Sequence, residues 1–175
     1  GLSTCAVCDG FFYRNKAVAV VGGGDSAMEE AHYLAKLASS VTLVHRRDKF
    51  RASKAMQDKI FNNPKIKIIW NTEVTDTLSD SSGLTGIVMK NQNGESSQLK
   101  VDGLFMAIGH NPNTDFLKGL VELDPQGYVL CKPGSTATNV PGIFAAGDVE
   151  DNKFRQAITS AGRGCQSALE AERYI

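Results

Sequence analysis

Two cysteines separated by two residues and followed at once by an acid are the residues of this chain best suited to chemistry. Cys5 and Cys8 can close a small disulfide, and the local field of such a pair lowers one thiol pKa to about 7. Thiolate is then available at neutral pH, and the carboxyl of Asp9 can hand a proton to a leaving thiolate. These residues therefore predict a redox-active dithiol.

Two other uses of this cysteine pair stay open. A zinc site needs a second pair of Cys or His ligands, whereas the remaining cysteines, Cys131 and Cys165, are isolated and far apart in the sequence. We therefore expect no metal. A pair of inert, buried thiols is the second alternative.

A glycine-rich loop follows the cysteines and matches the pattern GxGxxA, directly after an apolar run and at the start of a helical pattern. Gly22 permits the tight turn, Gly24 lets a pyrophosphate approach the backbone, and the small Ala27 allows close contact between helix and strand. The loop residues expected at a dinucleotide are Gly22, Gly24, Asp25, Ser26 and Ala27. An ordinary glycine turn between strand and helix is the alternative.

Basic residues stand just past the second apolar run, where NAD-binding proteins usually place an acid that holds the ribose hydroxyls. His45 is followed by Arg46 and Arg47, and Arg51 comes about one helical turn later. Guanidinium groups suit a 2′-phosphate, so the pattern favours NADPH over NADH. The alternative is a solvated basic loop, because an acid and a lysine are interspersed among these bases.

Hydrophobic periodicity indicates the elements that position these groups. Continuous apolar runs predict buried parallel strands at 17–21, 41–44 and 104–108. An amphipathic pattern from Asp25 predicts a helix between the first two, which gives a strand–helix–strand unit with a right-handed crossover. Alternation at Ile66, Ile68 and Trp70 predicts a further strand. With the runs near 74–78, 84–90 and 98–101, which Ser-Gly and Asn-Gly turns separate, it predicts a small antiparallel meander.

The sequence beyond this point has a different character. The stretch before Gly147 and Asp148 has the pattern of strand, glycine and acid, although Asp148 taken alone could also be a helix cap. The closing run from Gln156 to Tyr174 predicts a long helix with small residues facing inward. We place a domain boundary between a first domain, 1–108, and a second, 109–175.

Composition limits the classes of function. The chain has 175 residues, of which 42% are hydrophobic, so it can bury a core. Lys plus Arg and Asp plus Glu both number 19, so no global field attracts nucleic acid or an anionic membrane. We expect no membrane span and no signal peptide. Four cysteines, two of them in Cys-x-x-Cys, favour the reducing cytoplasm over an extracellular disulfide framework.

Six motifs stand in one order along the chain: Cys5–Gly10, Gly22–Ala27, His45–Asp48, Ala107–His110, Gly147–Asp148 and Arg155–Thr159. Together they resemble the low-molecular-weight, NADPH-dependent thioredoxin reductases of the bacterial and plant type, over essentially the whole chain. The resemblance implies an α/β fold. Its first part would be a Rossmann-like, three-layer NADPH domain with an antiparallel meander and the redox pair. Its second part would be the C-terminal portion of an FAD-type Rossmann-like domain.

The resemblance also implies an electron route, from NADPH to FAD, from FAD to the disulfide, and from the dithiol to thioredoxin. By position, Cys8 would face the flavin, Cys5 would attack the disulfide of thioredoxin, and Asp9 would be the general acid. A homodimer is implied as well. The further cofactor-binding residues are Ile108, Gly147, Asp148, Val149, Arg155, Gln156 and Ala157.

One departure from the family bears on function. Its members carry an N-terminal flavin-domain segment with its own GxGxxG loop, whereas this sequence starts just before the cysteines. We therefore expect the chain to bind NADPH and to hold FAD weakly or not at all by itself. Two functions stay open: a thioredoxin reductase or a truncated form of one, and a non-catalytic NADP-binding module without electron transfer to the cysteines.

Overall fold

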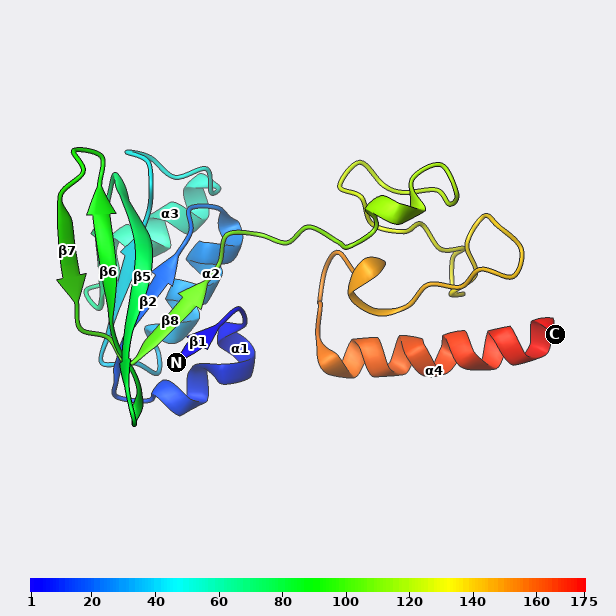
Figure 1. Cartoon of the computed structure of the whole chain (residues 1–175), viewed down its shortest axis with the longest axis horizontal. Helices are drawn as coiled ribbons and strands as arrows, with labels where there is room; N and C mark the ends of the chain where they lie inside the picture. The colour runs from blue at the N-terminus through cyan, green and yellow to red at the C-terminus, as the bar shows by residue number, and fades with distance from the viewer. The chain divides into compact units, whose positions relative to one another are not determined.

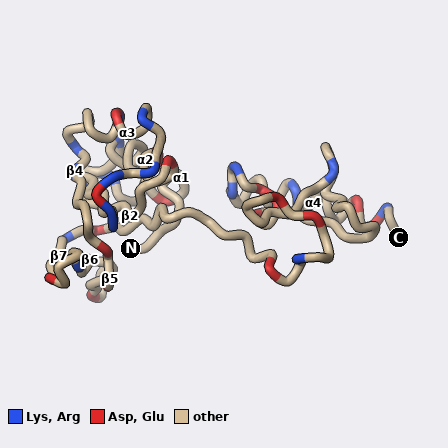
Figure 2. The backbone as a smooth tube through the Cα atoms, turned by 90° about the horizontal axis from the view of Figure 1, so that it is seen from above, with Lys and Arg blue, Asp and Glu red and all other residues tan.

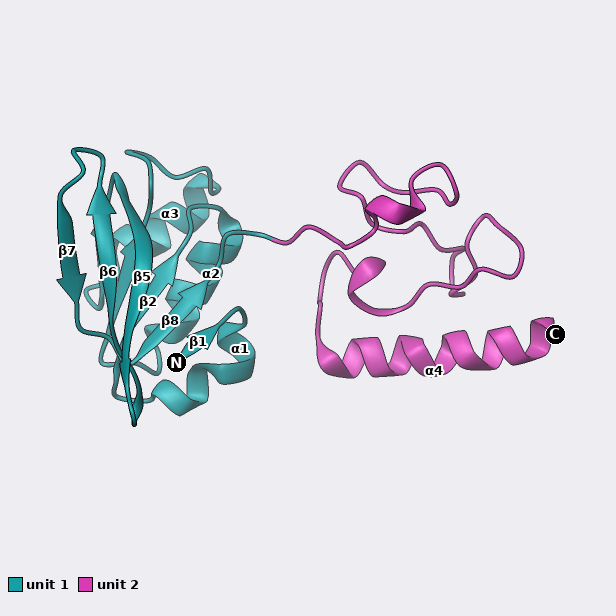
Figure 3. Cartoon of the chain, in the orientation of Figure 1, with its two compact units in different colours: residues 1–109 teal, residues 110–175 magenta.

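The computed structural model describes residues 1–175 and divides the chain into two compact units, Gly1–Gly109 and His110–Ile175 (Figure 3). Unit 1 contains both β-sheets, and unit 2 contains the longest helix. Neither unit has a helix that combines the length and the apolarity needed to cross a membrane.

A five-stranded parallel sheet forms the middle of unit 1, with the strand order β1-β8-β2-β3-β4. Figure 1 labels β1, β8 and β2 of this sheet. Its strands are β1 (Leu2–Ser3), β2 (Ala17–Val21), β3 (Ser40–Val44), β4 (Ile66–Ile69) and β8 (Gly103–Met106). Both faces are covered, because Val18 and Val20 lie in one buried cluster while Ala19 lies in another. The predicted parallel strands are confirmed, and β1 and β4 form the two edges of the sheet. The strand expected at 66–70 exists as β4, but it pairs in parallel with β3 and is not part of the meander.

Helices cover one face of this sheet and a second sheet covers the other. The helical side carries α1 (Ala6–Asp9), the 3-10 turn η1 (Gly10–Tyr13), α2 (Asp25–Leu34) and α3 (Lys54–Phe61). The opposite side carries the antiparallel strands β5 (Thr72–Asp80), β6 (Gly83–Asn91) and β7 (Ser96–Leu99). The expected three-layer fold with an antiparallel meander is thus confirmed.

Unit 2 consists of irregular segments, the 3-10 turns η2 (Asp115–Leu117) and η3 (Gly147–Val149), and the helix α4 (Ala157–Tyr174). A small core of Val121, Val129 and Ala145 lies among the segments. The strand expected before Gly147 is wrong as a sheet element. Phe144 makes one isolated bridge, to Ala137, and no ladder forms because the segment has no neighbouring strand in this unit.

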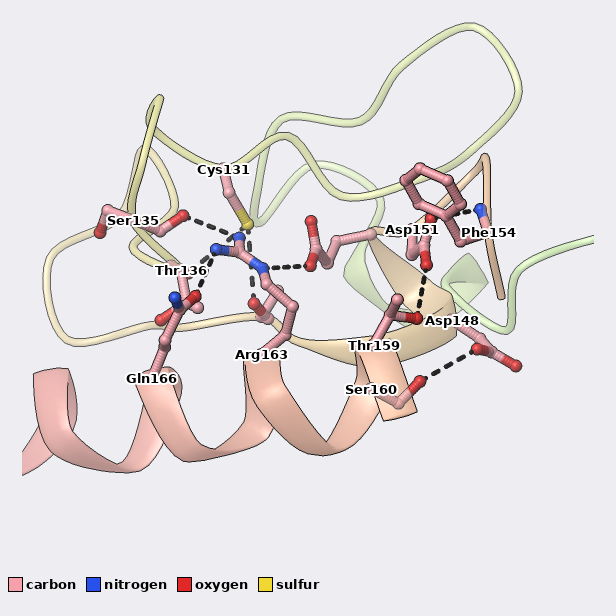
Figure 4. A network of polar contacts seen from close by, with 12 residues as sticks. Cys131, Ser135, Thr136, Asp148, Asp151, Phe154, Thr159, Ser160, Arg163 and Gln166 are labelled. Carbon is pink, nitrogen blue, oxygen red and sulfur yellow. Dashed lines mark hydrogen bonds and ion pairs between the residues drawn. The ribbon is translucent and has the colours of Figure 1, made fainter. Parts of the chain in front are cut away.

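The long closing helix is confirmed, but its expected inward face is wrong. The residues expected inside are exposed, Ile158 to 81%, and so are Ala161 and Cys165. Polar side chains on the opposite side hold α4 instead. Arg163 Nε lies 2.6 Å from Glu150 Oε1, and Glu170 Oε2 accepts a hydrogen bond of 2.8 Å from the Thr136 N–H (Figure 4 shows the Arg163 network). These charged contacts, together with an edge contact between the rings of Tyr174 and Phe144, attach the helix to its unit.

Glu30 on α2 is a half-buried acid in unit 1 without a basic partner to compensate its charge. Its Oε2 is buried without a hydrogen-bond partner, and burial raises the pKa of this carboxyl to about 7. The folded protein therefore holds Glu30 neutral over a pH range in which the unfolded chain ionises it. The contribution of protonated Glu30 to the free energy of unfolding is complete below the unfolded pKa of 4.5. It is lost as the pH rises through the folded pKa of about 7.

We predict that Glu30→Gln removes this pH dependence. The shift corresponds to about 3 kcal/mol at most, and solvent screening of the partly exposed group reduces it to about 1 kcal/mol. The variant should gain that free energy of unfolding at pH 8 and almost nothing at pH 5. Urea unfolding followed by the fluorescence of Trp70, the single tryptophan and part of unit 1, measures both values. Glu29→Gln, on an exposed neighbour, is the control, and an equal gain at both pH values would contradict the assignment.

Candidate functional site

Cys5 and Cys8 form a disulfide just beyond the end of β1. Because β1 runs parallel to β8, the pair stands near the carboxyl edge of the sheet. Cys5 is the N-cap of α1, and its Sγ accepts a hydrogen bond of 3.1 Å from the backbone N–H of Cys8. That N–H stabilises negative charge on the Cys5 sulfur once the bond is reduced, while Cys8 is the more exposed of the two residues.

Asp9 is held beside the disulfide by Ser3, a residue that the sequence reasoning missed. The Ser3 hydroxyl donates to Asp9 Oδ2 at 2.7 Å and accepts from the Cys5 N–H at 3.1 Å. Ser3 is buried, so it ties the acid to the backbone of the nucleophilic segment. The available signal was a hydroxyl residue two positions before the first cysteine. Burial and, second, the charge of Asp9 raise the pKa of the nearby Tyr13.

Exposed apolar side chains adjoin the disulfide on the same helical segment. Val7 lies between the two cysteines, and Phe11 and Phe12 follow on η1, with Phe12 exposed to 70%. The guanidinium of Arg14 lies 5.2 Å from the ring centre of Phe11. We call Val7, Phe11 and Phe12 the α1 patch, because large apolar groups gathered in the open are typical of a protein-binding surface.

A cavity of about 530 Å³ opens at the carboxyl ends of β2, β3 and β8. It is lined by Val21–Gly24, Ser26, Val44–Arg47, Arg51, Thr72–Val74 and Ala107–Gly109. The structure thus brings together eight residues expected at a cofactor: Gly22, Gly24, Ser26, His45, Arg46, Arg47, Arg51 and Ile108. The other two from the glycine loop, Asp25 and Ala27, lie outside the lining. Thr72, Glu73 and Val74 are lining residues that the sequence reasoning missed.

The glycines of the loop have separate reasons to lack a side chain. A Cβ on Gly22, at φ 156°, would collide with the Ala107 carbonyl oxygen and the Ala27 side chain. A Cβ on Gly23 would collide with the His45 ring. A Cβ on Gly24 would meet no protein atom within 4 Å, so this position is open toward the cavity. Gly24 is therefore where a ligand can approach the backbone.

The basic segment after β3 is fastened to the glycine loop. The Gly23 carbonyl accepts hydrogen bonds from the Arg51 N–H at 2.8 Å and the Ala52 N–H at 3.2 Å. Asp25 Oδ1 accepts from the N–H of Ser53 at 2.9 Å and from its hydroxyl at 2.8 Å, which holds the pKa of Asp25 below its usual value. Asp25 is thus engaged within the protein and positions the loop that carries Arg51.

Three guanidinium groups reach the cavity from this segment, whose Lys and Arg residues are blue in Figure 2. Arg46, Arg47 and Arg51 are exposed, and none of them makes an ion pair within the chain. His45 differs, since its ring is buried, with Nε2 3.0 Å from the Lys49 carbonyl oxygen. Unpaired arginines beside an open glycine suit a ligand that carries several phosphates.

In unit 2 the expected cofactor residues gather at the N-terminal end of α4. Asp148 Oδ1 accepts from the Ser160 hydroxyl at 3.3 Å (Figure 4), and Gln156 forms a capping box with Thr159. Arg155 adopts a left-handed backbone, φ 50°, with Nη1 3.4 Å from the Tyr128 hydroxyl. The whole set comprises Gly147, Asp148, Val149, Arg155, Gln156 and Ala157. One Asp148 oxygen and the free N–H groups of the first helical turn are suited to a hydroxylated or anionic group.

Comparison with known proteins identifies the family. A sequence model described as pyridine nucleotide-disulphide oxidoreductase matches residues 1–164. The chain is 58% identical to thioredoxin reductase 1, mitochondrial, of Arabidopsis thaliana, over 100% of this chain and 48% of that protein. It is 54% identical to glucosaminate ammonia-lyase of Pseudomonas fluorescens, over 100% and 57%.

Solved structures agree with the sequence relatives. Thioredoxin reductase from Streptococcus pyogenes superposes with a TM-score of 0.92 at 39% identity, over 99% of this chain and 57% of that one. The chain spans about half the length of the curated relatives it matches. With a match that takes in both the cysteine pair and the glycine loop, the chain belongs to the pyridine nucleotide-disulphide oxidoreductase family.

Proposed function

We propose that this chain carries the NADPH site and the redox disulfide of a thioredoxin reductase. The observation that carries the proposal is the presence, in one unit, of the Cys5–Cys8 disulfide and of a cavity with three unpaired arginines. Relatives with the name thioredoxin reductase support it. A relative named as an ammonia-lyase is nearly as similar, so the proposal rests on the disulfide and the cavity of this chain and not on overall identity alone.

NADPH fits the residues of the cavity. The open backbone at Gly24 and the N-terminus of α2 would receive the pyrophosphate. Arg46, Arg47 and Arg51 would hold the 2′-phosphate, and Ile108, which the lining places after β8, would flank the nicotinamide half. We propose residues 1–108 as the NADPH domain on this basis.

FAD would supply the transfer of two electrons between NADPH and the disulfide. The unit 2 residues that would hold it are Gly147, Asp148, Val149, Arg155, Gln156 and Ala157, and we propose 109–175 as part of an FAD domain. The fit to these residues is partial, since they offer one carboxylate oxygen and one helix N-terminus. A homodimer and a reducing cytoplasm complete the proposal.

The chain's own residues account for the exchange with thioredoxin. Cys5 thiolate, stabilised by the Cys8 N–H, attacks one sulfur of the thioredoxin disulfide and forms a mixed disulfide. Cys8 thiolate then attacks the Cys5 sulfur, which restores the Cys5–Cys8 bond and releases thioredoxin with two thiols. Asp9, oriented by Ser3, supplies a proton to a departing thiolate. The α1 patch offers the apolar surface against which a partner can dock.

Replacing Arg46 and Arg47 together by Ala should weaken NADPH binding about 100-fold while NADH binding stays nearly unchanged. Two charge-assisted contacts to the 2′-phosphate are lost, and NADH has no such phosphate. Isothermal titration calorimetry with both dinucleotides measures the effect. Lys54→Ala, which removes an exposed ion pair with Asp58 outside the cavity, is the control. Equal losses for both dinucleotides would refute the 2′-phosphate assignment.

Gly24→Ala should weaken binding of both dinucleotides by at least about tenfold while the chain stays folded, with the melting temperature lowered only slightly because Ala is a poorer N-cap of α2 than Gly. The added methyl meets no protein atom and occupies space needed by the pyrophosphate, which NADPH and NADH share. Binding is measured by calorimetry and folding by thermal unfolding. Gly164→Ala, also in open space but on α4, should leave binding unchanged. Undiminished affinity in Gly24→Ala would place the pyrophosphate elsewhere.

Cys8→Ser should trap a mixed disulfide between Cys5 and thioredoxin, and Cys5→Ser should form none. The chain is reduced with dithiothreitol, freed of reductant and mixed with oxidised thioredoxin, so that no flavin is needed. Non-reducing electrophoresis detects the adduct. Cys8→Ser combined with Cys165→Ser, which also removes an exposed free thiol, should still form the mixed disulfide with thioredoxin. The reverse pattern would exchange the roles of the two cysteines.

A further inference from the structure

Glu73 is the single acid among the residues that line the arginine-rich cavity. It lies near the start of β5, and the chain reaches it through Asn71, which has a left-handed backbone at φ 53°. The Asn71 N–H donates to the Arg47 carbonyl at 3.2 Å, and the Thr72 N–H donates to the His45 carbonyl at 3.1 Å. The start of β5 is therefore bonded to the segment that carries the arginines, which fixes the acid at the cavity.

No ion pair within the chain engages the Glu73 carboxylate. Arg46, Arg47 and Arg51 line the same cavity without pairing with it. Lys90 stands opposite Glu73 in the β5–β6 register, makes no ion pair with it, and lies outside the lining. The carboxylate thus has no counter-ion within the chain, in a cavity otherwise suited to phosphate.

A carboxylate has opposite effects on the two nicotinamide dinucleotides. It repels a 2′-phosphate, and it accepts hydrogen bonds from ribose hydroxyls, which is the task that NAD-binding proteins assign to an acid after the second strand. In this chain that position holds arginines, and the acid comes from β5 instead.

We propose that Glu73 is a specificity-determining residue, which lowers the preference of the cavity for the phosphorylated dinucleotide over the unphosphorylated one. The inference rests on the proposed NADPH site. It assigns the arginines and Glu73 opposing contributions, so that selectivity is set by their balance and not by the arginines alone.

The test is the ratio of dissociation constants, NADH over NADPH, measured by calorimetry for the wild-type chain and for Glu73→Gln. The amide removes the charge at nearly constant shape, so the ratio should rise about three- to tenfold, and the rise should shrink at high salt. Asp48→Asn is the matched control, since Asp48 is an exposed acid beside Arg47 that does not line the cavity. Trp70 fluorescence verifies that each variant is folded.

Each outcome decides one question. An unchanged ratio in Glu73→Gln overturns the inference, and so does an equal rise in Asp48→Asn, which would reduce the effect to general surface charge. A wild-type chain that binds neither dinucleotide overturns the proposed function itself. A wild-type chain that binds NADPH, together with an unchanged ratio in Glu73→Gln, overturns this inference alone.

Discussion

Both candidate sites of unit 1 depend on strand β8, which pairs in parallel with β1 on one side and β2 on the other. Register fixes Ser3 opposite Phe105, and Phe105 opposite Val20. The chain therefore leaves β1 toward the disulfide at about the level where β2 runs on toward the glycine loop. Because the carboxyl ends of parallel strands lie at one edge of a sheet, the disulfide and the glycine loop are brought to the same edge.

The sequence predicted those features that local pattern determines. The apolar run 17–21, the glycine loop and the helix that follows are contiguous, and period and turn chemistry identify them. Asn71 and Glu73 were missed because hydrogen bonds from a segment distant in sequence place them at the cavity. Ser3 was missed for another reason, since its bonds to Cys5 and Asp9 are local but depend on a turn that no pattern indicates. The strand β1 was also missed, because two residues are too few to have a pattern of their own.

The error at α4 has a different cause. An amphipathic pattern identifies two faces of a helix, but burial depends on what the neighbouring segments offer. In unit 2 these segments offer the Glu150 carboxylate and the Ser135 carbonyl, which Arg163 meets at 2.6 and 2.8 Å. The bonds of this guanidinium to two other segments turn the Arg163 side of α4 toward its unit and leave the apolar stripe exposed. The expected strand before Gly147 fails likewise, because a strand is defined by its neighbour.

The capping hydrogen bond at Cys5 links the redox state of the cysteine pair to the local order of the backbone. In the disulfide the Cys5 sulfur is a weak, neutral acceptor for the Cys8 N–H, whereas in the dithiol it can be an anion at the N-terminus of α1. Reduction therefore removes a covalent restraint on this single turn and strengthens its N-cap in the same step. The turn is thereby kept ordered in the dithiol form, in which Cys5 would be the nucleophile of the proposed exchange.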